Sequence, residues 1–152
     1  MELSLLNELN AGSKDELLGA LKRAVAAASF PPVDPRMVNN HIHTTYSFSP
    51  YSPTAAVYAA RAEGLATCGI VDHDSIGGAE EFIQAGEIVG IPTTIGIETR
   101  VSFAETPLSD RRTNNPYQIG NSYMVLHAVP HDKISTVQAY FAPLRERRNA
   151  RN

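Results

Sequence analysis

The sequence predicts an α/β fold in which parallel strands alternate with helices. From Met37 onward, short apolar runs alternate with segments whose apolar residues recur at helical spacing, and Gly or Pro residues mark many of the boundaries. This alternation occurs four times and therefore favours about four parallel βα units. Before these units, residues 1–30 show the apolar spacing of two short helices.

The N-terminal residues are expected to form a helical extension followed by a linker. Leucines form a stripe at residues 3–9, and Ser13 is a suitable N-cap for the second helix. Three prolines within residues 31–35 then stop helix formation, because proline lacks an N–H donor and has a fixed φ angle. We expect residues 1–36 to form this extension and linker, and residues 37–152 to form the main domain.

Each element of the main domain has its own sequence signal. The expected strands are Met37–His43, Ala66–Val71, Thr93–Phe103 and Tyr123–Val129. The expected helices run from Pro53 to about Gly64, from about Gly78 to Val89, and from Ser135 to Arg151 with a break at Pro143. A polar loop over residues 104–120 separates the last two strands, and a loop of that length is more often functional than accidental.

The composition is typical of one globular domain, with 152 residues, 43% hydrophobic residues and a net charge of −3. At this length folding removes roughly 68–70% of the unfolded surface from water, so a core can form without disulfides or a structural metal. The single Cys68 excludes an intramolecular disulfide. No run approaches the ~18 apolar residues of a membrane span, and the N-terminus lacks the basic start of a signal peptide. We therefore expect a cytoplasmic protein without membrane association, whose net charge does not indicate nucleic-acid binding.

Histidines and one glutamate lie where the predicted strands end. His41 and His43 are two residues apart, so the strand period places both side chains on one face. His73 and His127 each follow an apolar run, and Glu98 interrupts the apolar run of the third strand. A carboxylate at such a position needs a cation or hydrogen-bond donors. Because parallel α/β folds build their sites at the carboxyl ends of strands, we expect these five residues to bind metal.

The donor set narrows the choice of metal. Imidazole nitrogens with a carboxylate oxygen suit Zn, Mn or Fe, and five ligands exceed the needs of one tetrahedral ion with an open position. Simpler interpretations also exist: Arg100 can pair with Glu98 instead of a phosphate, and Asp74 or Ser75 is expected to cap the helix that follows.

These motifs resemble those of the PHP family, named for polymerase and histidinol phosphatase. The first family motif, His-x-His-Thr-x-x-Ser, matches residues 41–47, the Asp-His-Asp motif matches residues 72–74, and the Gly-x-Glu motif matches residues 96–98. A downstream strand histidine of the family matches His127. The resemblance covers about residues 37–152 and implies the N-terminal part of a TIM-like (βα)7 barrel.

The resemblance also implies a function. Members hydrolyse phosphate esters such as small-molecule phosphates, nucleotides or nucleic-acid ends, with two or three divalent ions that activate water and neutralise the phosphoryl oxygens. By this resemblance His41, His43, His73, Glu98 and His127 hold the ions. Asp72 and Asp74 would orient ligands or carry protons, and Arg100 would contact the phosphate.

Two departures from the family pattern leave an alternative open. Many members have Asp-Gly after the serine of the first motif, whereas this chain has Phe48-Ser49. Further family ligands come from later strands, and nothing after His131 and Asp132 matches them. The alternative is therefore a non-catalytic PHP-like module that binds metal or a partner.

The length gives a further expectation, because a TIM-type barrel usually has ~250 residues. We expect a barrel truncated at its C-terminus, whose open sheet edge is a candidate surface for homo-oligomer formation. An amidohydrolase, which also begins with His-x-His, normally needs a metal-bridging lysine at a strand end. Lys14, Lys22 and Lys133 do not lie at such positions, so this function is disfavoured.

Overall fold

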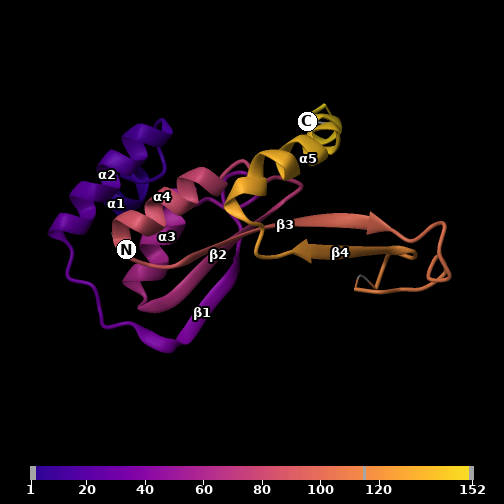
Figure 1. Ribbon diagram of the computed structural model, residues 1–152, viewed down its shortest axis with the longest axis horizontal. Coiled ribbons are helices and arrows are strands. Elements are labelled where there is room, and N and C mark those ends of the chain that lie inside the picture. The colour runs from indigo at the N-terminus through magenta and orange to yellow at the C-terminus, as the bar shows by residue number, and fades with distance from the viewer. Residues whose placement is uncertain (1–2, 115, 151–152) are drawn as a thin grey trace.

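The computed structural model describes residues 3–114 and 116–150, in which one four-stranded sheet has helices packed on one side (Figure 1). The strands are β1 (Asp34–Ile42), β2 (Leu65–His73), β3 (Thr93–Ser102) and β4 (Asn121–Leu126), in this order across the sheet. The helices are α1 (Leu3–Glu8), α2 (Lys14–Ala27), α3 (Pro53–Ala62), α4 (Ala79–Val89), the short 3-10 helix η1 (His131–Lys133) and α5 (Ile134–Asn149). Strands β1, β2 and β3 are parallel, with α3 and α4 as their crossovers. This arrangement is a partial TIM-like barrel and confirms the predicted fold class.

Helix boundaries follow the capping signals of the sequence. The Ser52 hydroxyl accepts the N–H of Ala55 at 2.9 Å, and Pro53 occupies the first turn of α3, where its missing N–H has no cost. Helix α4 ends at Gly90, whose φ of 73° lies in the left-handed region that favours glycine. Helix α2 begins with a capping box between Ser13 and Glu16.

The hydrophobic core lies between the sheet and helices α2, α3 and α4. Phe82 of α4 and Val57 of α3 are fully buried and pack with Ile70 and Ile95 of the two central strands. Leu21 of α2 is also fully buried in this same cluster. The N-terminal helices therefore share one core with the strands that carry the candidate site.

Strand β4 corrects the prediction of a fourth parallel βα unit. It pairs with β3 in the antiparallel direction, and it spans 121–126 instead of 123–129. The described residues between β3 and β4, 103–114 and 116–120, contain no crossover helix, and a strand that returns without a crossover must run antiparallel to its neighbour. Figure 1 shows the result, a two-stranded ribbon that projects from the body of the molecule.

Three smaller expectations were also wrong. Strand β1 begins at Asp34, inside the expected linker, because an edge strand tolerates the missing N–H of Pro35. Helix α5 continues through Pro143, which removes one donor without ending the helix, while Arg151 lies outside the described residues. Helix α4 begins at Ala79 with Gly78 as its N-cap, too far along the chain for a cap from Asp74 or Ser75.

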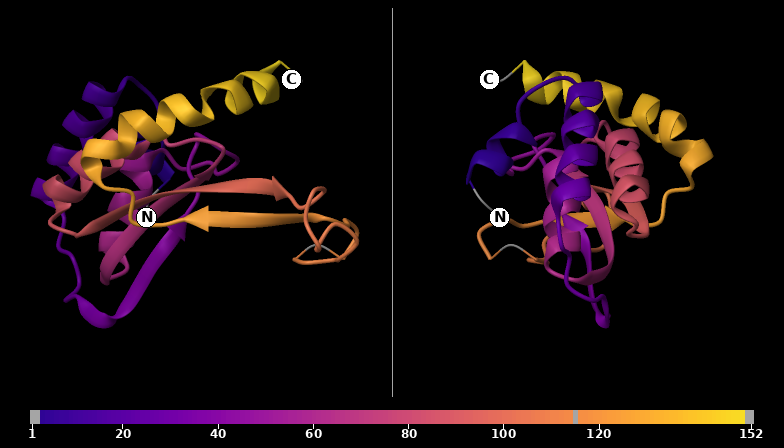
Figure 2. Two further views of the ribbon diagram at one scale, coloured as in Figure 1. Left: turned by 45° about the vertical axis from the view of Figure 1, so that its right-hand side comes forward. Right: turned by 90° about the vertical axis from the view of Figure 1, so that its left-hand side faces the viewer.

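The sheet has β1 and β4 at its edges, and apolar side chains are exposed on both. Val38 of β1 and Met124 and Leu126 of β4 are each more than half exposed. Helix α5 runs alongside the projecting β3–β4 ribbon (Figure 2). Within the described part of the chain, no helix has the length and hydrophobicity to cross a membrane.

Candidate metal centre

The ends of the three parallel strands bring four predicted ligands together. His41 lies near the end of β1, with His43 just beyond it, and His73 is the last residue of β2. The register pairs His73 directly with Glu98 of β3, so their side chains share one face of the sheet. This face is opposite to the one that carries Asp72.

The carboxylate of Glu98 is surrounded by imidazole nitrogens. Its Oε2 atom lies 3.0 Å from Nε2 of His41, 3.3 Å from Nε2 of His43 and 4.0 Å from Nε2 of His73. Ligand atoms of His41, His43 and Glu98 all lie within 4.8 Å of one another. Two imidazoles and one largely buried carboxylate are a donor set that fits a divalent transition-metal ion.

The environment of His43 favours the neutral imidazole that metal binding requires. Its ring stacks on the ring of His73, with centroids 4.8 Å apart and an interplanar angle of 21°. Burial, and next the neighbouring charge of His73, lower the pKa of His43 below its usual value, although Glu98 acts in the opposite direction. A neutral His43 has a free lone pair for an ion.

Asp72 forms hydrogen bonds with the loop that carries His43. It is 1% exposed, and its carboxylate accepts hydrogen bonds from the N–H and the hydroxyl of Thr44 and from the hydroxyl of Ser47, each at 2.6 Å. Ser47 Oγ in turn lies 3.5 Å from Nδ1 of His43. Asp72 therefore holds the loop that follows β1 and reaches His43 through Ser47.

Asp74 and Arg100 form hydrogen bonds with neighbouring hydroxyl groups. Asp74 has a left-handed backbone conformation (φ 53°), and its carboxylate accepts the hydroxyl of Thr99 at 2.7 Å. Arg100 is exposed and donates to the hydroxyl of Tyr123 at 2.5 Å, with its guanidinium 5.0 Å from the centre of that ring. The alternative pairing of Arg100 with Glu98 is not seen among the described residues.

His127 lies at the periphery of the group. It follows the last residue of β4 and is exposed, and its ring centre is 6.3 Å from that of His41. The antiparallel direction of β4 places His127 beside Gly96, whereas Val125 pairs with Glu98. The structure thus gathers His41, His43 and Glu98 closely, with His73 next and His127 farther out.

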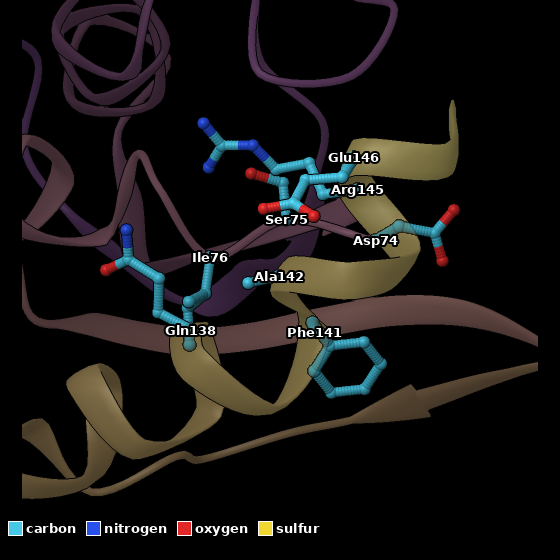
Figure 3. A pocket seen from close by; sticks show the side chains of 8 residues that line it. All are labelled: Asp74, Ser75, Ile76, Gln138, Phe141, Ala142, Arg145 and Glu146. Carbon is cyan, nitrogen blue, oxygen red and sulfur yellow. The ribbon is translucent and has the colours of Figure 1, made fainter. Parts of the chain in front are cut away.

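A cavity of about 650 Å³ adjoins the metal-binding group. It extends from His73 and Phe48 along the ribbon to α5, where Arg147 lines its far wall. A second cavity of about 270 Å³ lies where α5 passes the loop after β2. Asp74 and Arg145 both line that second cavity, and in Figure 3 their carboxylate and guanidinium groups point in opposite directions.

Sequence reasoning missed the positions of Thr44 and Tyr123. Thr44 is a fully buried polar residue inside the first motif, and its role depends on a contact with Asp72 that is distant in sequence. Tyr123 shares the face of β4 that pairs with Glu98 and Arg100, and the alternation of that strand was an available signal. Its ring centre lies 5.3 Å from that of His73.

Comparisons with known proteins agree with this geometry. Over 63 residues the chain is 40% identical to a 5'-3' exoribonuclease of Haemophilus influenzae, which covers 41% of this chain and 23% of that protein. Over 69 residues it is 39% identical to the DNA polymerase III subunit alpha of Saccharopolyspora erythraea, which covers 44% of this chain and 6% of that protein. The chain therefore spans less than a quarter of the length of either relative.

Solved structures show the same fold. A protein of Bifidobacterium adolescentis that is described as a "putative metal-dependent phosphoesterase" aligns with a TM-score of 0.52 and 23% identity over 74% of this chain and 34% of that one. An amidohydrolase from Chromobacterium violaceum aligns with a TM-score of 0.58 and 25% identity over 73% of this chain and 34% of that one.

The group of His41, His43 and Glu98 is compatible with a divalent metal ion. The family model for the PHP domain matches residues 39–144, which include the whole group of His41, His43, His73, Glu98 and His127. The chain belongs to the PHP domain family.

Proposed function

We propose that this chain contributes the main metal ligands of a hydrolase that cleaves phosphate esters. The observation that carries the proposal is the position of Glu98 Oε2 between the Nε2 atoms of His41, His43 and His73. A carboxylate oxygen with three imidazole nitrogens around it is suited to bridge two divalent ions.

The residues divide into two groups around the bridging Glu98. His41 and His43 together with Glu98 would hold one ion, and His73 and His127 would add ligands for a further ion. Bound divalent ions, of Mn, Zn or Fe, lower the pKa of a coordinated water and neutralise charge on phosphoryl oxygens. Hydrolysis would join a water oxygen to phosphorus, break the bond between phosphorus and the ester oxygen, and deliver a proton to that leaving oxygen.

The remaining predicted residues would orient a ligand, carry a proton or contact the phosphate. Asp72, through Ser47, orients His43, while Asp74 stands next to His73 on the wall of the large cavity and can carry a proton. Arg100 lines the same cavity two residues beyond Glu98, where its guanidinium can contact a phosphate oxygen.

An amidohydrolase would need a lysine at a strand end, but Lys14 and Lys22 lie in α2 and Lys133 lies in η1. The competing function is a metal-binding module without catalysis. It shares the ligands and differs only in whether the bound ions support turnover.

The decisive experiment combines metal analysis with turnover of an aryl phosphate. We expect the chain to bind divalent metal and to hydrolyse the ester, and Glu98→Gln to lose at least about 100-fold in kcat/KM. Glu105→Gln, at an exposed glutamate in the loop after β3, is the matched control and should retain activity. Metal binding without turnover would support the non-catalytic module, and the lack of any bound metal would refute both functions.

A further inference from the structure

Phe48 is an aromatic side chain beside the metal-binding group that is largely exposed. It is 70% exposed, yet its ring centre lies only 4.7 Å from that of His43 and 5.2 Å from that of His73. Phe48 therefore offers an apolar, planar face beside the predicted ligands.

The cavity beside Phe48 combines this ring with positive charge. Arg100 and Arg147 line it from the ribbon and from α5, and Tyr123 adds a second ring next to His73. Its volume of about 650 Å³ lies within the range of small-molecule sites. An aromatic face together with guanidinium groups matches a ligand that has a planar ring and a phosphate.

We propose that Phe48 stacks on the base of a nucleotide whose phosphate lies at the metal-binding group. The inference rests on the proposed function and names the substrate class of the same site. Because every base has a π-face, stacking on Phe48 recognises nucleotides with little base selectivity. Arg100, two residues from Glu98 on β3, then lies beside the phosphate and not beside the base.

The position of Phe48 allows one nucleotide to stack its base on the ring and to place its phosphate at the metal-binding group. The ring contacts His43, a predicted ligand, on one side, and its exposed part borders the cavity. A phosphorylated sugar without a base fills the phosphate position and leaves Phe48 uncovered. The structure therefore predicts a difference in affinity between these two ligand types.

The test measures binding to the Mn²⁺-loaded chain by titration calorimetry. The two probes are adenosine 5′-monophosphate and ribose 5-phosphate, which differ by the base. We expect the nucleotide to bind roughly 10-fold more tightly, a gain typical of one base stacked on one aromatic ring.

Variants test whether the higher affinity for the nucleotide comes from Phe48. Phe48→Ala should weaken binding of the nucleotide to the level of ribose 5-phosphate and leave the sugar phosphate unchanged, whereas Phe48→Tyr should keep the preference. Tyr140→Ala removes another exposed aromatic ring, on α5, and serves as the matched control. Equal affinities in the unmodified chain, or an equal loss for both probes in Phe48→Ala, would overturn the inference.

Release of inorganic phosphate from both probes, measured in parallel, separates this inference from the proposed function. Hydrolysis without a preference for the nucleotide contradicts the role of Phe48 alone. A Phe48-dependent preference without hydrolysis supports the binding site and contradicts the proposed catalysis. If neither probe binds, the inference about Phe48 fails, and turnover of the aryl phosphate decides the proposed function separately.

Discussion

The carboxylate of Asp72 accepts a hydrogen bond from the hydroxyl of Ser47 at 2.6 Å, and this bond determines how Ser47 can interact with His43. A hydroxyl has one proton, so Ser47 Oγ can only accept from Nδ1 of His43, 3.5 Å away. Nδ1 of His43 then carries the proton, and Nε2, which faces Glu98, keeps its lone pair for a metal ion.

We predict that Ser47→Ala weakens metal binding without unfolding the protein. Loss of the partner that orients a ligating histidine typically lowers metal affinity by about 10- to 100-fold. Asp72→Asn should have a smaller effect, because an amide oxygen at the Oδ1 position still accepts from the N–H of Thr44 and from the hydroxyl of Ser47. Calorimetric titration with Mn²⁺ measures the effect, and Ser49→Ala in the same loop is the control. An unchanged affinity in Ser47→Ala would show that the contact does not orient His43.

Ser52 connects the N-terminal residues to the loop that carries the first motif. Its hydroxyl donates to the carbonyl of Leu9, and its N–H donates to Asn10 Oδ1 at 2.6 Å. We predict that Ser52→Ala lowers the free energy of unfolding by about 2 kcal/mol, because it removes the cap of α3 and leaves a buried carbonyl without its donor. Urea denaturation tests this value, with the exposed Ser135→Ala as control. If Ser52→Ala lowers the free energy of unfolding as little as the control does, residues 1–36 do not contribute to the stability of the domain through Ser52.

Ala128, directly after His127, has a left-handed backbone with φ 57°. This conformation costs an L-residue about 1 kcal/mol that glycine avoids. Ala128→Gly should therefore raise the melting temperature by roughly 2–4 °C in a chain of this size. Ala62→Gly, at the end of α3, should lower it, since glycine is unfavourable in a helix. Calorimetry that finds Ala128→Gly destabilising would rule out the left-handed turn.

Cys68 is fully buried in β2, and burial raises the pKa of its thiol from 9.0 to about 12. Because the folded state holds this proton more tightly, its contribution to stability is complete below pH 9 and is lost between pH 9 and about 12. We predict that an aromatic disulfide reagent does not react with the folded chain at pH 8 and reacts fully in urea. Rapid labelling of the folded chain at pH 8 would contradict the burial of β2.

Local patterns were sufficient to predict most of the residues that the structure brings together around Glu98. The spacing of His41 and His43 follows from the strand period, and Glu98 is a carboxylate in an otherwise apolar strand. Parallel strands then place such residues at one edge, as the pairing of His73 with Glu98 shows. Residues whose position depends only on strand period and direction could therefore be found from the sequence.

Long-range relationships could not be read in the same way. The direction of β4 depends on how the 103–120 connection folds, and it determines that His127 lies at the periphery. The hydrogen bonds of Asp72 to Thr44 and Ser47 join residues that are more than twenty positions apart. Periodicity describes one segment at a time, so it contains no information about such contacts.

The most direct test of the metal centre is a crystal structure of the chain soaked with Zn²⁺, in which anomalous scattering locates the ion. The arrangement around Glu98 predicts a peak about 2.0–2.2 Å from Nε2 of His41, Nε2 of His43 and one carboxylate oxygen of Glu98. In Glu98→Gln crystals that peak should disappear or weaken strongly. Zinc bound only elsewhere, for example at the exposed His131, with these three side chains free of metal, would contradict the central claim.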